Sequence, residues 1–234
     1  MLSVIVPAYN EADRLPPTLR RLRAWLDQAG EPYEVIVVDD GSEDATVPTT
    51  QAMRSGWAEL QVVRLPVNTG KGAAVRAGML RARGELRLFT DADLSAPIED
   101  LPRLRERIDG RCQVAIGSRA VDRSMVEVHQ PFHRELMGRV NNVLIRGLVL
   151  PGIRDTQCGF KLFTAESAVA CFAPLRTLRF GFDVEVLARA RRRGWTIAEV
   201  PVHWRHVEAS RVHALRDSAR MIWDLVAIRL RRDG

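Results

Sequence analysis

The chain has 234 residues, of which 46% are hydrophobic and 27% charged, and its formal net charge is +6. This length and balance are typical of one globular domain and argue against intrinsic disorder, a collagen-like chain or a coiled coil. No apolar run approaches the ~20 residues that span a bilayer, and no basic segment precedes the first apolar run, so we expect neither a membrane span nor a signal peptide. The three cysteines form no CxxC pair, so we expect a cytosolic protein without disulfides or a zinc site.

Apolar segments alternate with amphipathic ones over the first 120 residues. Residues 15–29 repeat apolar side chains at helical spacing and end at Gly30, and residues 70–84 show a second helical pattern that ends at Gly84. Five short segments, in which most residues are apolar, are expected to be strands: 2–8, 34–40, 58–65, 85–93 and 113–119. Buried strands separated by helices predict an α/β fold with a Rossmann-like, mostly parallel sheet and helices on both faces.

The pattern weakens after residue 120. Residues 120–135 show no clear periodicity and predict a mobile loop. Residues 155–164 are expected to be a loop that enters a short strand. Two further helices are expected at 137–150 and 182–194, and a strand at 196–204.

The chain ends in a predicted amphipathic helix, residues 211–232, whose apolar stripe includes Trp223 and is flanked by six arginines. This stripe either packs on the core or lies in a membrane interface. Residues 189–234 contain 11 basic and 5 acidic side chains, whereas residues 1–188 contain 24 of each. The excess favours an anionic membrane surface or a phosphorylated substrate, unless it reflects only an arginine-rich composition. Too few aromatic residues stand among these arginines for a nucleic-acid-binding surface, so we expect no nucleic acid partner.

Carboxylates follow two of the apolar strands at the point where each strand ends. Asp39 and Asp40 come after the second strand, and Asp91 and Asp93 come after the fourth. In a doubly wound sheet these strand ends share one edge, where ligands bind. A D-x-D pair suits Mg²⁺ or Mn²⁺ bound together with phosphate oxygens, whereas the alternative is that these residues only cap helices and turns. No GxGxxG motif follows the first strand, so the sequence favours a metal-bound phosphate ester over a dinucleotide.

Eight segments occur in an order that resembles glycosyltransferase family 2. They are VIVPAYNEADRL, VIVVDDGSEDAT, NTGKGAAVRAGMLRARGE, FTDADLSAPIEDL, GSR, DTQCGFKLF, FGFDVEVL and MIWDLVAIR. The resemblance covers nearly the whole chain, and NTGKGAAVRAG and DTQCGFKLF are most similar to the branch of dolichyl-phosphate or polyprenyl-phosphate β-glucosyltransferases. It implies a single continuous GT-A domain, with residues 1–120 as the donor-binding half and residues 121–234 as the acceptor-binding half.

The resemblance also implies roles for residues of the donor-binding half. The residues implied to bind the nucleotide sugar are Pro7, Ala8, Tyr9, Glu11, Asp39, Asp40, Lys71, Asp91 and Ala92. Lys71 would face the diphosphate from the start of its helix, where backbone N–H groups add donors for an anion. Asp91 and Asp93 would bind the metal and act in catalysis, with Asp93 as the more direct ligand.

Other residues are implied to serve the acceptor and the sugar. Arg119 and Arg134 would bind the acceptor phosphate, for which the forked guanidinium is well suited. The residues implied beside them, in contact with the acceptor and the donor sugar, are Asp155, Gln157 and Lys161. Asp183 and Glu185 would be catalytic carboxylates near the sugar, unless they only cap the helix that begins there. His203 would be either a third metal ligand or a histidine at a strand edge.

The reaction implied is an inverting transfer of a hexose, glucose from UDP-glucose, onto polyprenyl or dolichyl phosphate, with Mg²⁺ or Mn²⁺ as the cofactor. Three alternatives remain open: transfer from GDP-mannose, a soluble acceptor, and a nucleotide-sugar-binding module without catalysis. The expected partners are the nucleotide sugar, the lipid phosphate and the cytoplasmic face of a membrane, to which the protein would bind peripherally. A homodimer is also left open.

Overall fold

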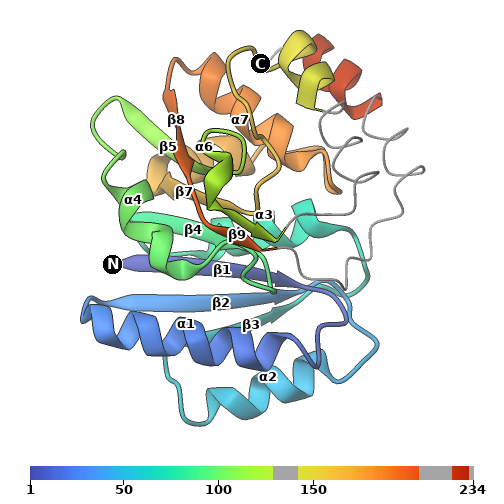
Figure 1. Ribbon diagram of the computed structural model, residues 1–234. Helices are drawn as coiled ribbons and strands as arrows, with labels where there is room; N and C mark the ends of the chain where they lie inside the picture. Colours follow the sequence, from blue (N-terminus) through green and yellow to red (C-terminus); the bar gives the residue numbers. More distant parts are fainter. Residues whose placement is uncertain (129–141, 206–222, 232–234) are drawn as a thin grey trace.

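A seven-stranded sheet forms the centre of the computed structural model, which describes residues 1–128, 142–205 and 223–231 (Figure 1). Its strands are β1 (Leu2–Ala8), β2 (Tyr33–Asp39), β3 (Leu60–Arg64), β4 (Leu86–Thr90), β5 (Cys112–Ser118), β7 (Phe160–Thr164) and β8 (Thr196–Pro201). They are ordered β3-β2-β1-β4-β7-β5-β8. All neighbouring strands are parallel except β7, which is antiparallel to both β4 and β5. A separate two-stranded sheet pairs β6 (Val126–Val128) with β9 (Trp204–Arg205).

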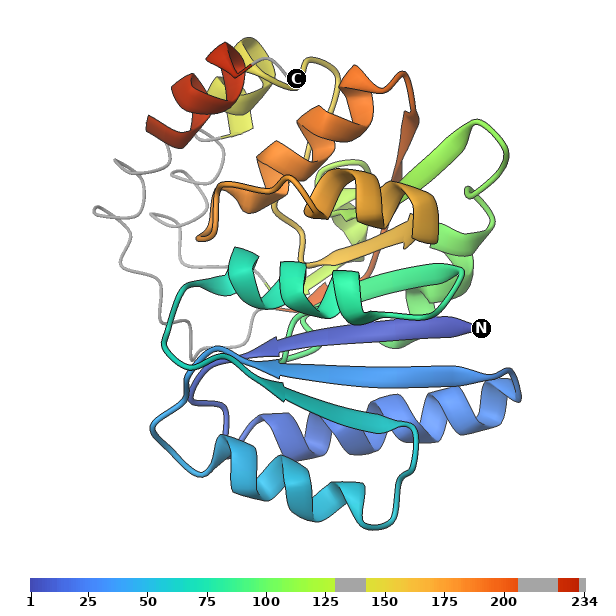
Figure 2. The ribbon, with the colours of Figure 1, turned by 180° about the vertical axis from the view of Figure 1, so that it is seen from behind.

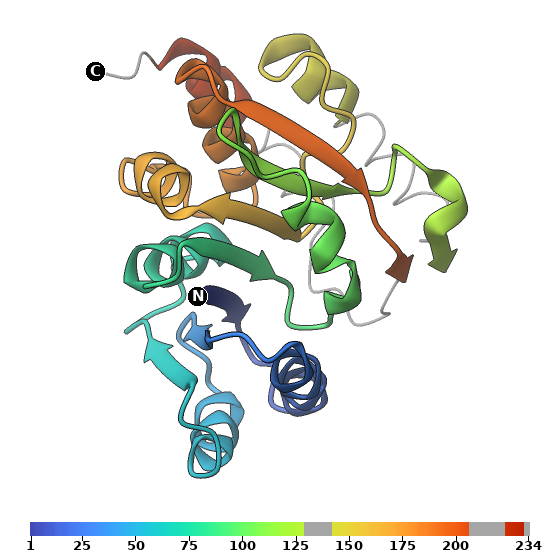
Figure 3. The same ribbon diagram turned by 90° about the vertical axis from the view of Figure 1, so that its left-hand side faces the viewer.

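Helices cover both faces of the central sheet. Their bounds are α1 (Leu15–Ala29), α2 (Thr46–Arg54), α3 (Lys71–Arg81), α4 (Leu101–Arg105), α6 (Ala165–Phe172) and α7 (Phe182–Arg192), and residues 142–148 and 223–230 are also helical. Figure 2 shows α3, α6 and α7 over one face, and Figure 3 shows α1 on the side opposite to α3. Among the described helices, none is long and apolar enough to cross a membrane.

Two apolar cores flank the sheet because side chains alternate along each strand. In β1, Ile5 belongs to the core under α3, whereas Val4 and Val6 belong to the core under α1. Helix α1 buries a stripe of leucines at helical spacing: Leu15, Leu19, Leu22 and Leu26. It ends at Gly30, whose φ of 67° suits glycine and stops the helix.

The predicted α/β fold is confirmed, with a mostly parallel sheet covered on both faces. Each of the five strands expected in the first 120 residues is present, and α1, α3 and α7 lie where helical spacing placed them. Helices α2, α4 and α6 were not predicted. Helix α2 contains three threonines, a valine and a proline, which are weak helix formers, and it buries only Thr46, Val47 and Thr50. The predicted loop 120–135 contains β6, and its part beyond residue 128 lies outside the described residues.

The direction of β7 decides where the segment before it lies. Because β7 runs opposite to β4, residues 155–159 lie at the edge of the sheet where β4 ends. The backbone N–H of Asp91, just after β4, donates to the carbonyl oxygen of Gly159 at 3.1 Å. The ends of β1, β2, β4 and β5 and the start of β7 therefore meet at one edge, where most of the expected site residues gather.

Candidate active site

The two carboxylates of the expected metal pair follow β4. Lys71 Nζ, at the start of α3, lies 2.5 Å from Asp91 Oδ1, and Asp93 Oδ1 accepts a hydrogen bond from Ser95 N at 2.9 Å. A Cβ atom on Gly159 would lie only 2.0 Å from Asp91 Oδ2. A larger residue at this position would therefore displace the Asp91 carboxylate.

This acidic pair fits a hard divalent cation. Mg²⁺ is commonly held by one or two carboxylates together with phosphate oxygens of a substrate, and Mn²⁺ also prefers oxygen ligands. Within the described ranges, no group of three or more His, Cys, Asp or Glu side chains could enclose a metal ion by itself. A cation at Asp91 and Asp93 would therefore need ligand oxygens to complete its coordination, and a nucleoside diphosphate supplies such oxygens.

His203 is placed beside a different carboxylate. Its backbone N–H donates to Asp100 Oδ2 at 2.7 Å, and its ring Nδ1 lies 3.1 Å from Asp100 Oδ1. Asp100 is buried in the turn before α4, where a carboxylate requires such partners. The prediction of His203 as a third metal ligand is therefore not supported by its placement.

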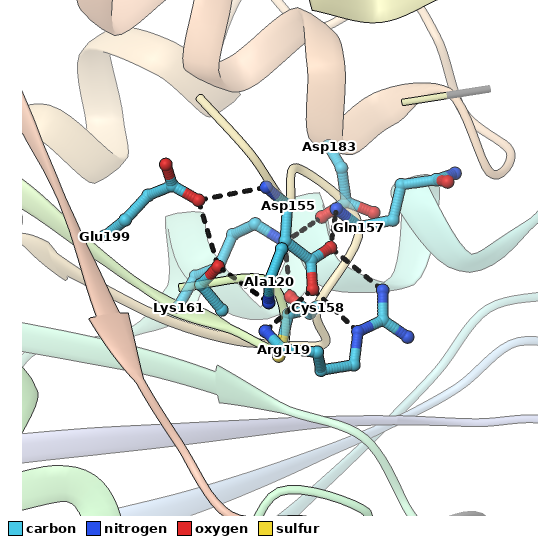
Figure 4. A network of polar contacts seen from close by, with 9 residues as sticks. Arg119, Ala120, Asp155, Gln157, Cys158, Lys161, Asp183 and Glu199 are labelled. Carbon is cyan, nitrogen blue, oxygen red and sulfur yellow. Dashed lines mark hydrogen bonds and ion pairs between the residues drawn. The ribbon is translucent and has the colours of Figure 1, made fainter. Parts of the chain in front are cut away.

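Lys161 and Asp183 form a buried ion pair (Figure 4). The side chain of Lys161 is fully buried, and its Nζ donates to Asp183 Oδ1 at 2.6 Å and to the carbonyl oxygen of Cys158 at 2.5 Å. The same ammonium lies 5.1 Å from the centre of the Phe89 ring. Burial raises the pKa of Asp183, against the opposing effect of the nearby lysine ammonium groups. Lys161 thus holds Asp183 from inside the fold, whereas the resemblance implied that Lys161 contacts the acceptor and the donor sugar.

Lys71 connects this buried pair to the acidic pair. Burial disfavours its ammonium, but the carboxylates of Asp91 and Asp183 outweigh burial and raise the pKa of Lys71 above its usual value. Lys71 therefore carries a positive charge at neutral pH. Its position is fixed by Gly70, whose φ of 118° and close approach to the carbonyl oxygen of Leu178 leave no room for a Cβ atom.

Arg119 and Asp155, both expected on the acceptor side, bind each other (Figure 4). Arg119 Nε and Nη2 donate to the two oxygens of Asp155 at 2.6 and 2.9 Å, and the backbone N–H of Arg119 adds a third bond at 3.0 Å. Burial would raise the pKa of Asp155, but the Arg119 guanidinium outweighs it and holds this pKa at about 2. The carboxylate is buried, whereas the Arg119 side chain is 28% exposed and stacks over Trp204. Arg119 can therefore meet a ligand, and Asp155 holds it in place.

Glu199 of β8 supports this arrangement and was not expected from the sequence. Its Oε1 accepts hydrogen bonds from Asp155 N at 2.9 Å (Figure 4) and from Ser118 Oγ at 3.0 Å. Its Oε2 accepts from Arg154 N at 2.8 Å. The backbone N–H of Gln157 then donates to Asp155 Oδ1 at 3.2 Å. The only sequence signal for Glu199 is an acidic residue inside an otherwise apolar strand.

Glu185 makes its contacts with residues other than the acidic pair, and these contacts hold α7 in place. Its Oε1 accepts from Arg189 Nη2 at 2.8 Å, and its Oε2 accepts from Thr177 N at 2.8 Å and lies 3.3 Å from Arg231 Nη1. Burial raises the pKa of Glu185, but these hydrogen bonds outweigh it and lower the pKa. The contacts join α7 to the preceding loop and to the end of the chain, so they support the structural alternative and not a catalytic role.

Asp39 and Asp40 at the end of β2 have different environments. Asp40 accepts hydrogen bonds from Thr69 N at 2.9 Å and Gly70 N at 2.8 Å, so it holds the loop that leads to Lys71. Burial raises the pKa of Asp40, and the two backbone bonds oppose this rise. Both oxygens of Asp40 are thus used by the chain itself.

Asp39 is fully buried, and only one of its oxygens is paired. Its Oδ2 accepts from Ser42 N at 3.1 Å and lies 3.6 Å from Arg64 Nε. Its Oδ1 has no hydrogen-bond partner among the described residues. Ser42 and Arg64 line a groove of about 700 Å³, together with Tyr9 and Asn68. Two of the residues that line the groove, Ser42 and Arg64, therefore contact Asp39.

The remaining expected residues, apart from Arg134, lie at or just after the ends of β1 and β4. Pro7 and Ala8 are buried at the end of β1, and Glu11 pairs with Arg14 at 2.6 Å. The carbonyl oxygen of Ala92 accepts a hydrogen bond from Thr18 at 2.6 Å. Arg134 lies outside the described residues.

Asn10 is a further residue that the sequence did not single out. Its φ of 54° is unusual for a residue other than glycine. Its Oδ1 accepts hydrogen bonds from Glu43 N at 2.9 Å and Asp44 N at 3.3 Å. These bonds fix the loop after β2 against the loop after β1, and so shape the groove. Asn10 stands in the P-A-Y-N-E string at the end of the first strand, but its role in fixing the two loops follows only from the backbone conformation.

Comparison with known proteins finds relatives that match nearly the whole chain. The dolichyl-phosphate beta-glucosyltransferase of Drosophila melanogaster is 41% identical over 98% of this chain and 74% of its own length. The human protein of the same name is 38% identical over 98% of this chain and 75% of its own length.

Solved structures show the same fold. Glucosyl-3-phosphoglycerate synthase from Mycobacterium tuberculosis, crystallised with Mn²⁺ and UDP-glucose, superposes with a TM-score of 0.74 at 20% identity, over 100% of this chain and 80% of its own. The family profile described as glycosyl transferase family 2 matches residues 3–172. The chain therefore belongs to glycosyl transferase family 2 and is a glycosyltransferase.

Proposed function

We propose that this enzyme transfers glucose from UDP-glucose to a polyprenyl phosphate such as dolichyl phosphate, with inversion at the anomeric carbon. Relatives that match nearly the whole chain at 34–41% identity carry the name dolichyl-phosphate beta-glucosyltransferase. The observation that carries the choice of nucleotide is the unpaired oxygen of Asp39. In this proposal, residues 1–120 bind the donor and residues 121–234 contribute most of the acceptor side.

The environment of Asp39 favours uracil over guanine. A buried carboxylate oxygen without a partner is rare and calls for a donor. Since Asp39 Oδ2 already accepts from Ser42 N, Oδ1 is the oxygen that still lacks a donor among the described residues. The imide of uracil offers one N–H donor, whereas the edge of guanine offers two neighbouring donors that suit a carboxylate with both oxygens free.

Replacing Asp39 with alanine is expected to weaken UDP binding by at least tenfold. A hydrogen bond to a charged group contributes about 1.5 to 3 kcal/mol, which corresponds to roughly 10- to 150-fold in affinity. Calorimetric titration with UDP and with GDP measures the effect. The matched control is Glu43→Ala, which removes an exposed carboxylate from the same groove. Unchanged UDP affinity in Asp39→Ala, or tighter binding of GDP than of UDP by the wild type, would contradict the assignment.

The chain's residues have distinct tasks in the proposed reaction. The acceptor phosphate is already an anion at pH 7 and needs to be positioned in line with the anomeric carbon more than it needs a general base. Arg119 is suited to hold it, because Asp155 uses only Nε and Nη2 and leaves Nη1 without a hydrogen bond within the described parts of the chain. Asp183, fixed by Lys161, supplies negative charge for an oxocarbenium-like transition state. A Mg²⁺ or Mn²⁺ ion held by Asp91 and Asp93 would neutralise the departing diphosphate.

A lipid acceptor requires contact with a membrane, and two neighbouring helices offer a surface for it. Residues 142–148 and 223–230 form helices that lie side by side (Figures 1 and 2). The second helix buries Leu225 and Ile228 in the core, so one face of its stripe packs on the protein. The exposed apolar residues of the two helices, which we call the apolar patch, are Val143, Leu144, Leu148, Trp223, Val226 and Leu230.

We propose that the apolar patch rests on the cytoplasmic face of an anionic membrane. Trp223 and Leu230 are 77% and 75% exposed, which is unusual for large apolar side chains and typical of interfacial helices. The whole net charge of +6 lies in residues 189–234, which include the second helix of the patch. Basic residues near an anionic surface contribute about 1 kcal/mol each.

Vesicle flotation is expected to show binding to anionic vesicles that partly survives about 0.5 M salt, where charges more than a few Å apart are screened. Replacing Trp223 and Leu230 with serine should abolish the part that resists salt. The control Val169→Ser changes an exposed apolar residue on α6, outside the apolar patch, and should bind like the wild type. Absence of binding to anionic vesicles even at low salt would contradict the proposal.

A further inference from the structure

Lys71 lies where it competes with a divalent cation for Asp91. Its Nζ is 2.5 Å from Asp91 Oδ1. The other oxygen, Oδ2, lies against Gly159, in the space that a Cβ atom on this residue would take. A cation at Asp91 and the Lys71 ammonium would repel each other at this distance.

The neighbouring lysine leaves Lys71 without a second strong partner. Asp183 is already bound by Lys161 Nζ at 2.6 Å, and this ammonium is fully buried. Both lysines lie over the ring of Phe89, at 5.9 Å for Lys71 and 5.1 Å for Lys161. Among the described residues, the one ion pair of Lys71 is with Asp91. Its side chain is 24% exposed, so the ammonium can move toward a ligand.

The net charge of the cluster around Lys71 indicates when a move of its ammonium away from Asp91 is favourable. Two lysines face three carboxylates in this cluster, those of Asp91, Asp93 and Asp183, so its net charge is −1. A divalent cation alone reverses the sign of the cluster. The diphosphate of a nucleotide sugar carries two negative charges, and its binding together with the cation restores the original net charge. The cluster is therefore balanced when empty or when both ligands are present.

We propose that Lys71 is an internal counter-ion of Asp91 that hinders metal binding until a nucleoside diphosphate attracts its ammonium, so that metal and nucleotide bind cooperatively. This inference rests on the proposed function, because it assumes a cation at Asp91 and Asp93 and a diphosphate beside it. Cooperativity of this kind is reciprocal: the nucleotide raises the affinity for the metal by the same factor as the metal raises the affinity for the nucleotide. Lys71 is thus assigned a role in the order of binding in addition to contact with the donor.

The test measures Mn²⁺ binding directly, by the electron paramagnetic resonance signal of free Mn²⁺, with and without saturating UDP. For the wild type we expect weak binding of Mn²⁺ alone and at least tenfold tighter binding with UDP. Lys71→Met should bind Mn²⁺ alone at least tenfold more tightly than the wild type, and UDP should strengthen this binding less. Lys71→Gln gives the same comparison with a polar side chain, in case the methionine variant does not fold.

The matched control is Arg76→Met, which removes one positive charge from the same helix. The Arg76 guanidinium binds the carbonyl oxygens of Phe172 and Ala173 and not the acidic pair. It should leave Mn²⁺ affinity within about twofold of the wild type. Unchanged or weaker binding of Mn²⁺ alone in folded Lys71→Met or Lys71→Gln, with normal Mn²⁺ binding by the wild type in the presence of UDP, would overturn the inference alone. Absence of Mn²⁺ binding by the wild type even with UDP would overturn the metal site of the proposed function as well.

Discussion

Replacing Asp93 with asparagine is expected to lower kcat for glycosyl transfer by about a thousandfold. The amide oxygen can still accept the hydrogen bond from Ser95 N, so the loop after β4 should keep its shape. The lost negative charge weakens the site that would compensate the departing diphosphate, and such electrostatic compensation contributes several kcal/mol to lowering the barrier. About 4 kcal/mol corresponds to a thousandfold change in rate. Steady-state kinetics at saturating UDP-glucose and Mn²⁺ measures this effect.

Asp109→Asn is the matched control for this prediction. Asp109 Oδ1 accepts a hydrogen bond from Arg111 N at 2.7 Å, two residues ahead, as Asp93 does from Ser95 N. It precedes β5 and therefore lies at the opposite edge of the sheet. The control should keep kcat within about twofold of the wild type. Retention of more than about a tenth of the activity in Asp93→Asn would contradict the metal role.

The second large effect is expected for stability. Asp155→Asn removes the charge that balances the Arg119 guanidinium in a partly buried pair. Breaking such a pair by changing one partner costs about 3 to 5 kcal/mol, and the partial exposure of Arg119 places the expected loss near about 3 kcal/mol. Urea unfolding followed by circular dichroism measures the loss in the free energy of unfolding.

Glu99→Gln is a control with similar geometry on the surface. Arg21 Nε and Nη2 bind the two oxygens of Glu99 at 3.2 and 2.9 Å, but both side chains are about half exposed. Exposed pairs contribute about 0 to 1 kcal/mol, so this variant should unfold almost like the wild type. Equal losses in the two variants would show that burial does not strengthen the Arg119–Asp155 pair.

Acid should reduce the difference between the wild type and Asp155→Asn. The pKa of Asp155 is about 2 in the folded protein and lies near its ordinary value of 3.8 in the unfolded chain. The pair therefore contributes its full stability above about pH 4 and loses it as the pH falls toward 2. The two proteins should differ most at pH 5 and progressively less toward pH 2.

The positions of the carboxylates could be predicted from the sequence, whereas most of their partners could not. Asp39 and Asp91 follow apolar strands, and parallel strands bring their ends to one edge whatever the details of packing. The pairing of Lys161 with Asp183 joins residues 22 positions apart and depends on how α7 packs against β7. No local pattern carries that information, and the resemblance implied instead that Lys161 contacts the acceptor and the donor sugar.

The direction of β7 is a second property that local patterns do not contain. An apolar segment has the same alternation whether it pairs in the parallel or the antiparallel direction. In this fold the antiparallel direction brings Gly159 against Asp91 and Asp155 against Arg119. The roles of Glu185 and Glu199 depend equally on tertiary contacts: one acidic residue at a helix start packs the helix, and an acid within a strand holds the site.

The most direct measurement is transfer of the sugar itself. The purified enzyme is incubated with polyprenyl phosphate, Mg²⁺ and, in parallel, UDP-glucose and GDP-mannose, and the lipid phase is analysed by mass spectrometry, with the anomeric configuration determined by NMR. We predict a hexosyl polyprenyl phosphate of β configuration from UDP-glucose, its loss with EDTA, and no comparable product from GDP-mannose. A mannosyl lipid from GDP-mannose, or no glycolipid from UDP-glucose with an enzyme shown to be folded by circular dichroism, would contradict this prediction.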